Sequence, residues 1–123
     1  MIKNFRFEKD SMGEIKVPSE ALWGAQTQRS IINFSIGEEL IPIELIYSIT
    51  VIKKASAIAN FKLGLIDKVK KDLIIEACEE ILAGKHDSQF PLKIWQTGSG
   101  TQTNMNINAV SYTHLTLPTI LRV

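Results

Sequence analysis

The apolar residues in the middle of the chain recur at the spacing of a buried helix. The segment of residues 43–62 follows Pro42, a residue suited to the first turn of a helix, and it contains no glycine or further proline. Ile46, Ile49 and Ile52 keep a roughly helical spacing within it. Further apolar residues widen the stripe that they form, namely Leu45, Val51 and Ile58. A stripe of this width predicts a long helix that is buried on more than one side.

A second amphipathic segment follows directly. Asp67 is a suitable N-cap and Gly84 a suitable stop, so the pattern predicts a helix over residues 67–83. Its apolar residues gather on one side and its charged residues mostly on the other, which is typical of a helix with one solvated face. Cys78 falls near the apolar side, where it is expected to be a small buried hydrophobic residue rather than a nucleophile.

Near the N-terminus the pattern changes from helical spacing to alternation. Residues 2–8 alternate between apolar and polar, residues 10–13 have the composition of a turn, and residues 14–18 return as a second strand. Ser19 is the predicted N-cap of a helical segment, and a second helical run ends near Gly37. The apolar residues of these two runs are Leu22, Trp23, Ala25, Ile31, Ile32 and Phe34. The predicted fold class is therefore mainly α with a short N-terminal β-hairpin.

An uncharged polar stretch, WQTGSGTQTNMN, follows the second long segment. Its two glycines, Gly98 and Gly100, are too close together for a P-loop, and the third glycine of a dinucleotide-binding fingerprint is absent. If a helix begins near Thr101, its free N–H groups and its positive dipole end face the hydroxyls of Ser99 and Thr101. That arrangement suits a small anion, and a carboxylate has the right size.

Asn104 extends the same candidate site. On a helix, Asn104 lies three residues beyond Thr101 on the same face, where its amide could add a donor. An ordinary capping loop with a polar surface accounts for the same residues, so the local chemistry leaves both interpretations open.

The composition of the chain argues against several classes of function. With 14 basic and 13 acidic residues the net charge is +1, so nothing indicates binding to nucleic acid or to an anionic membrane. The single cysteine permits no intramolecular disulfide and fits a reducing compartment, which favours a cytoplasmic location. No apolar segment is long enough to span a bilayer. No cluster of His, Cys, Asp and Glu has the spacing of metal ligands, and neither a metal nor a cofactor is expected.

Three longer stretches, EKDSMGEIKVP, LWGAQTQRS and FPLKIWQTGSGTQTNMN, resemble the N-terminal region of class II fumarases, in the fumarase/aspartase superfamily. The resemblance runs from about Phe5 to Asn108. Aspartate ammonia-lyases, the nearest relatives, typically read YQGGAGTS at residues 95–102 and YYGVHT at residues 22–27, and the fumarase version stands at both places. The resemblance implies reversible hydration of fumarate to L-malate, a step of the tricarboxylic acid cycle, by a homotetramer.

The resemblance also implies roles for individual residues. In the family the Ser-Gly-Thr that corresponds to Ser99, Gly100 and Thr101 binds a substrate carboxylate, and Asn104 is our addition to that site. The catalytic serine loop and the catalytic histidine of the family lie downstream of where this chain stops, so it is expected to hold no catalytic residue and to be inactive alone. His114 repeats part of the family's histidine motif, but Tyr112 replaces the arginine of that motif, and His114 is not expected to be catalytic.

The end of the chain departs from the family's pattern. Residues 1–109 are expected to form the family's N-terminal lyase domain, in truncated form. Residues 110–123 are rich in β-branched side chains and contain Pro118, which disfavour a helix, and are expected to be disordered or artefactual. Two alternatives stay open: a fragment of an aspartate ammonia-lyase type of enzyme, and a non-catalytic helical interaction module.

Overall fold

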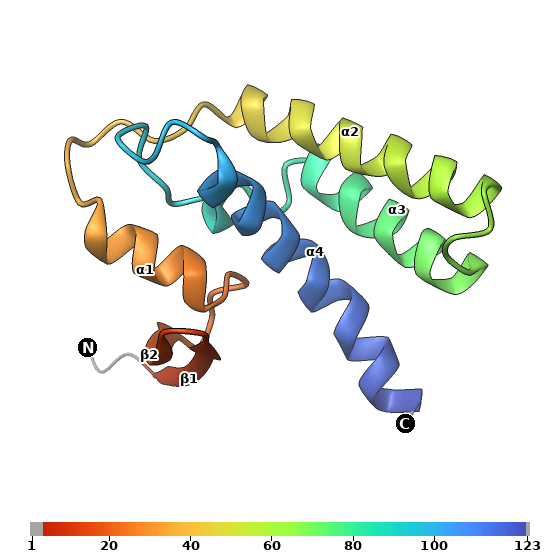
Figure 1. Cartoon of the computed structure of the whole chain (residues 1–123), viewed down its shortest axis with the longest axis horizontal. Helices are drawn as coiled ribbons and strands as arrows, with labels where there is room; N and C mark the ends of the chain where they lie inside the picture. Colours follow the sequence, from red (N-terminus) through yellow and green to blue (C-terminus); the bar gives the residue numbers. More distant parts are fainter. Residues whose placement is uncertain (1–3, 123) are drawn as a thin grey trace. The chain divides into compact units, whose positions relative to one another are not determined.

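The structure, a computed structural model, describes the backbone of residues 4–122 and the side chains of residues 4–112 (Figure 1). Over that range it contains one two-stranded sheet and four α-helices, which confirms the predicted mainly α fold with a short hairpin. The chain divides into two compact units. One comprises Met1–Ile41 and Ser88–Ala109, and the other comprises Pro42–Asp87 and Val110–Val123.

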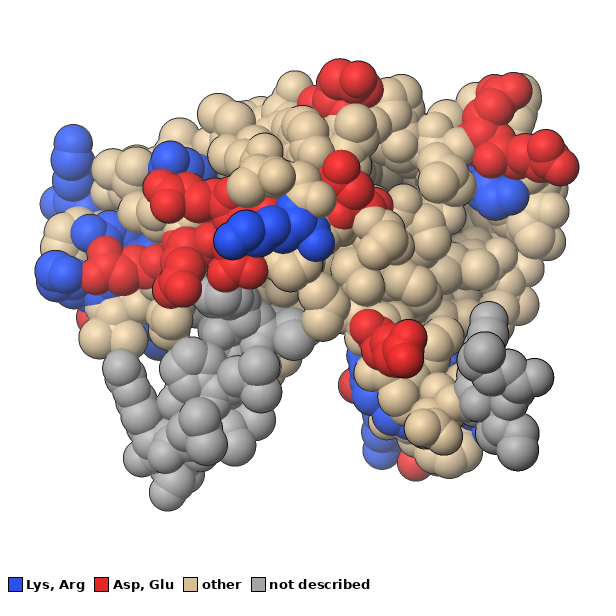
Figure 2. Space-filling view, turned by 180° about the vertical axis from the view of Figure 1, so that it is seen from behind, with Lys and Arg blue, Asp and Glu red and all other residues tan. Residues whose placement is uncertain are grey.

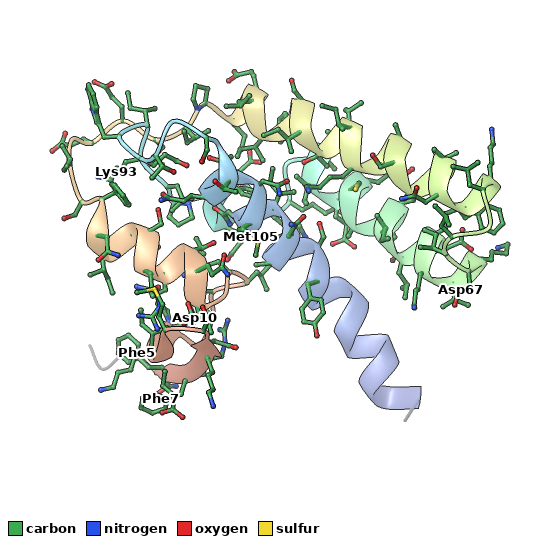
Figure 3. All side chains as sticks on the ribbon, in the orientation of Figure 1. Phe5, Phe7, Asp10, Asp67, Lys93 and Met105 are labelled. Carbon is green, nitrogen blue, oxygen red and sulfur yellow. The ribbon has the colours of Figure 1, made fainter. Side chains whose placement is uncertain are left out.

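The predicted N-terminal hairpin is present. Strands β1 (Phe5–Asp10) and β2 (Gly13–Pro18) pair in antiparallel register. The Asp10 carboxylate accepts a hydrogen bond from the Met12 amide at 2.9 Å, which stabilises the turn between them. Phe5 and Phe7 project from the hairpin and are more than half exposed (Figure 3), whereas Val17 is buried. The hairpin therefore has one covered side and one open side.

The segment after the hairpin differs from the prediction. Helix α1 runs over Ala25–Asn33 with Gly24 at its N-cap, so the prediction of Ser19 as a cap was wrong. The helix includes Ile31 and Ile32 of the second predicted run, but only Ala25 of the apolar residues of the first. Residues 20–24 are not helical. The Arg6 guanidinium accounts for this: it donates to the carbonyl oxygens of Pro18 at 2.9 Å, Ala21 at 2.8 Å and Trp23 at 2.7 Å. These carbonyl groups are thereby satisfied without a helix.

An ion pair fastens α1 to the hairpin. The Arg29 guanidinium donates to both carboxylate oxygens of Asp10, at 2.8 and 3.0 Å, and to the Gly13 carbonyl oxygen at 2.9 Å. The hydrogen bonds from Arg29 lower the pKa of the Asp10 carboxyl below its ordinary value. A bidentate pair of this kind also fixes the angle between the groups that it joins.

Replacing Asp10 with asparagine should therefore lower the free energy of unfolding at neutral pH. Because the folded state holds the Asp10 pKa below the unfolded value, the pair contributes fully above about pH 4, and its contribution is lost as the pH falls through the folded pKa. The difference between the wild type and Asp10→Asn should shrink in acid. Urea titrations at a series of pH values measure this. Glu14→Gln, on the exposed surface of β2, is the control, and an equal pH dependence in both variants would contradict the expectation.

The two long helices are confirmed. Helix α2 spans Ile43–Lys62 and helix α3 spans Lys68–Leu82, and they lie side by side (Figure 1). The Asp67 carboxylate accepts a hydrogen bond from the Lys70 amide at 2.7 Å, as expected of an N-cap, and Gly84 follows α3 with a φ of 82°. Residues of both helices are buried in this unit: Ile46, Thr50, Ala57, Ala77, Cys78 and Ile81. Burial raises the pKa of the Cys78 thiol, consistent with the expected structural role.

The prediction that the helix at 43–62 is buried on more than one side was wrong for this chain. Leu45, Val51 and Ile52 are exposed by 46%, 53% and 64%. The reason is that α3 is a single helix and covers one face of α2, whereas the apolar stripe of α2 is wider than one face.

Helix α4 begins at Thr101, as predicted, and continues to Arg122. The prediction that residues beyond 110 depart from helix was wrong. Each β-branched residue disfavours a helix by only a few tenths of a kcal/mol, and a helix that has already formed gains one hydrogen bond for each residue added. Pro118 lacks one of these donors and its ring crowds the preceding turn, a cost that falls near the end of the helix. The His114 side chain lies outside the described residues, so the expectation about His114 stays a prediction.

The described surface is mixed in charge. In the view of Figure 2, acidic and basic side chains lie interspersed rather than gathered into a patch of one sign. None of the helices in the described part of the chain is long and apolar enough to cross a membrane.

Candidate functional site

The polar stretch before α4 stands on a fixed base. Phe90 and Leu92 are buried, and the residues after them run alongside residues 39–41. The Ile41 amide donates to the Leu92 carbonyl oxygen, and the Ile94 amide donates to the Glu39 carbonyl oxygen, each at 3.0 Å. These bonds set where the polar stretch leaves the core.

Lys93 and Trp95 complete this base. Lys93, labelled in Figure 3, donates from its ammonium group to the Gly37 carbonyl oxygen at 2.7 Å. The Trp95 ring lies so close to Gly37 that an added Cβ would stand 2.7 Å from a ring carbon. Gly37 also has a φ of 73°, so two independent constraints require glycine there.

The residues between this base and α4, 97–100, form what we call the site loop. The hydroxyls of Ser99 and Thr101 are hydrogen-bonded to each other, and the Thr97 hydroxyl lies 3.4 Å from that of Ser99. All three side chains are exposed. The first backbone hydrogen bond of α4 runs from the Asn104 amide to the Gly100 carbonyl oxygen at 3.1 Å. The structure thus brings Ser99, Gly100 and Thr101 together at the start of a helix.

The other predicted site residue, Asn104, lies one turn further along α4. Its backbone takes part in the first helical bond, and its side chain is partly buried. Asn108, on the next turn, donates its amide to the Met105 sulfur at 3.8 Å. Thr101 and Asn104 therefore lie three residues apart on α4, the spacing expected for one face of a helix.

The two glycines of the site loop differ in kind. Gly100 has a φ of 78°, in the left-handed region, whereas Gly98 does not have a positive φ. A Cβ added at Gly98 would meet no atom within 4 Å. The fold of the described chain needs glycine at 100 but not at 98, so the space beside Gly98 is open to a ligand.

Because of this difference, alanine substitutions at the two glycines should change the free energy of unfolding by different amounts. Gly100→Ala should lower the free energy of unfolding by about 1–2 kcal/mol, the strain of a left-handed non-glycine residue. Gly98→Ala should leave it unchanged or raise it by about 0.4–1 kcal/mol, because alanine restricts the unfolded chain. Urea denaturation of the two variants side by side measures both. A larger loss for Gly98→Ala than for Gly100→Ala would show that this account of the loop is wrong.

Electrostatically the site is neutral apart from the helix itself. Residues 94–112 contain no charged side chain, and no acidic residue stands in the first turn of α4. The N–H groups of that turn and two adjacent hydroxyls therefore offer uncharged donors and a positive dipole end to an incoming group. The described residues hold no group of three or more His, Cys, Asp and Glu that could bind a metal. The arrangement can bind a small anion such as a carboxylate, and it offers no general base.

Sequence reasoning missed three polar side chains that support this loop. Gln96 bonds to Thr103, and Gln102 bonds to Ser30 on α1. The Asn106 amide donates to the Gln89 carbonyl oxygen at 2.9 Å. Each pair joins residues far enough apart in sequence that no periodic pattern marks it.

The fold and the site can now be compared with known proteins. The chain belongs to the lyase family, whose model matches residues 13–115.

Individual relatives narrow the likeness to class II fumarate hydratases. The chain is 90% identical over 110 residues to the class II fumarate hydratase of Prochlorococcus marinus subsp. pastoris, across 89% of this chain and 24% of that protein. It is 58% identical over 106 residues to the enzyme of that name from Campylobacter jejuni, across 86% of this chain and 23% of the other. The chain thus spans about a quarter of the length of the curated relatives that it matches.

A solved structure agrees with these relatives. The crystal structure of class II fumarase from Schistosoma mansoni superposes with a TM-score of 0.88 at 48% identity, over 90% of this chain and 24% of that one.

Proposed function

We propose that this chain is part of a fumarate hydratase and binds one carboxylate of fumarate or L-malate at the start of α4. The observation that carries the proposal is the pair of bonded hydroxyls of Ser99 and Thr101 at the N-terminus of a helix, in a chain 90% identical to a class II fumarate hydratase. Gly100 gives the backbone its left-handed turn there, and Asn104 supplies an amide one turn along.

Neutral donors suit this task. The substrate is a small dianion that must be held in one orientation while water is added across its double bond. Hydroxyls and helix N–H groups hold one carboxylate without bringing in a titratable group. The site loop contains no residue that could take a proton from carbon, so proton transfer and stabilisation of the developing charge belong to residues outside the site loop.

The setting of the enzyme belongs to the same proposal. A fumarate hydratase of this kind would act in the tricarboxylic acid cycle, in the cytoplasm, as a homotetramer. The relatives support the reading as a fumarate hydratase over an aspartate ammonia-lyase or a non-catalytic helical module, because those named above carry the first name. We also retain the proposal that residues 1–109 form the lyase domain and that residues 110–123 are not part of it.

A chimeric enzyme tests the proposal. Residues 4–109 of this chain would replace the matching segment of the Prochlorococcus marinus enzyme. The chimera should hydrate fumarate at a rate within a few-fold of the parent enzyme, measured as the loss of the ultraviolet absorbance of fumarate. This chain alone should not hydrate fumarate. A chimera that folds and assembles like the parent but lacks activity would contradict the proposal and favour the helical module.

A further inference from the structure

One hydrogen bond between side chains closes the site loop. The Thr103 hydroxyl, on the first turn of α4, donates to the Gln96 side-chain oxygen at 3.0 Å. The Gln96 amide nitrogen in turn donates to the Lys93 carbonyl oxygen at 2.8 Å. Lys93 belongs to the fixed base of the loop. The start of α4 is therefore tied, through Gln96, to the segment from which the loop departs.

The position of this bond differs from that of the site hydroxyls. Thr103 is 4% exposed and Gln96 is partly buried, whereas Thr97, Ser99 and Thr101 are exposed. The side-chain bonds described for Thr97, Ser99 and Thr101 run among these three residues. The three hydroxyls thus contact one another, and the position of all three depends on how the two ends of the site loop are held.

A second bond holds the same helical turn from the other side. Gln102 and the Ser30 hydroxyl are hydrogen-bonded, which links the first turn of α4 to α1. With Gln102 and Thr103 both engaged, the first turn of α4 has little freedom to rotate about its axis. Rotation of that turn would change where the free N–H groups and the Thr101 hydroxyl point.

We propose that Gln96 and Thr103 are positioning residues for the carboxylate site. They touch no substrate. Their hydrogen bond sets the separation of the two loop ends, and so it aims the hydroxyls of Ser99 and Thr101 and the N–H groups of α4 at one point. This inference rests on the proposed function of that site. Neither residue has chemistry of its own to offer the reaction, so their effect appears as a change in how tightly the substrate is held.

The test uses the chimeric enzyme described above. Thr103→Val keeps the shape of the side chain and removes the hydroxyl, and it should raise KM for both fumarate and malate about tenfold or more, the scale expected of a small misplacement of binding groups. Thr103→Ser restores the hydroxyl and should return KM to near the parent value. Partial unfolding would lower the apparent kcat without raising KM.

A matched control comes from α2. Thr50 is also buried, and its hydroxyl donates to the Ile46 carbonyl oxygen of its own helix at 2.7 Å, so Thr50→Val removes a comparable bond that closes no loop. It should leave KM unchanged. Gln96→Met removes the bond to Thr103 and also the bond from Gln96 to the Lys93 carbonyl oxygen, so adding Thr103→Val to Gln96→Met should raise KM no further than Gln96→Met alone does.

The outcomes separate the two proposals. An unchanged KM in Thr103→Val, or a Thr103→Ser variant as impaired as Thr103→Val, would overturn the positioning role while Thr101→Ala still impaired the enzyme. Normal kinetics in Thr101→Ala would instead overturn the carboxylate site itself. If the Thr103→Val chimera does not fold, amide hydrogen exchange on this chain decides. Amides of residues 98–101 that exchange faster in Thr103→Val than in the wild-type chain, with unchanged exchange in α3, support the positioning role. Equal exchange of the loop amides in the two proteins overturns it.

Discussion

Thr101→Ala, introduced into the chimeric enzyme, is expected to lower kcat/KM for both fumarate and malate by a factor of about 10–1000, or about 1–4 kcal/mol of transition-state stabilisation. The substitution removes a hydroxyl that is hydrogen-bonded to Ser99 at the first residue of α4, and it leaves the helix N–H groups in place. A loss in both directions is required, because hydration and dehydration share one transition state. Steady-state assays from each substrate measure it.

Two companion variants sharpen this result. Thr101→Ser keeps the hydroxyl and should retain most of the activity. Thr97→Ala removes the hydroxyl furthest from the helix, which lies 3.4 Å from Ser99, and should have a smaller effect than Thr101→Ala. Unaltered constants for Thr101→Ala on both substrates would remove Thr101 from the site.

Ile46→Ala should cost about 2–5 kcal/mol of unfolding free energy, the usual cost of truncating a fully buried isoleucine. Ile46 is 1% exposed and lies in the core of the unit that contains α2 and α3. A loss of that size is a large share of the stability of an ordinary domain. Urea denaturation followed by helical circular dichroism measures it.

The control stands on the same helix. Ile52 is 64% exposed, and Ile52→Ala should cost about 0.5 kcal/mol or less. Equal losses for the two variants would mean that a surface other than the one described buries α2 in solution.

Local signals were enough to predict the long helices and the hairpin. For α3, the Asp67 cap and the Gly84 stop lie at its two ends, and the side chains between them separate into two faces. Residues 20–24 could not be predicted in the same way. Their conformation depends on Arg6, which lies on β1 and donates to the carbonyl oxygens of Ala21 and Trp23, and a local propensity contains no information about such a distant donor.

Some features of the candidate site could likewise be predicted from local sequence, and others could not. The start of a helix at Thr101 followed from glycine and hydroxyl chemistry within a few residues, and the structure has that start. The different demands on Gly98 and Gly100 depend on backbone angles that the letters of the sequence do not distinguish. The bond between Gln96 and Thr103 depends on where the chain turns, since amides and hydroxyls pair in many other ways when the backbone is undetermined.

The position of Trp95 gives the chain an optical label. Of the two tryptophans, Trp23 donates its indole N–H to the Gln28 side chain at 2.9 Å, and Trp95 is 58% exposed, over Gly37, one residue before Gln96. An indole in that place has a fluorescence that depends on how much water surrounds it. With Trp23 replaced by phenylalanine, the wavelength of maximum tryptophan emission would report directly on how exposed to water the base of the site loop is.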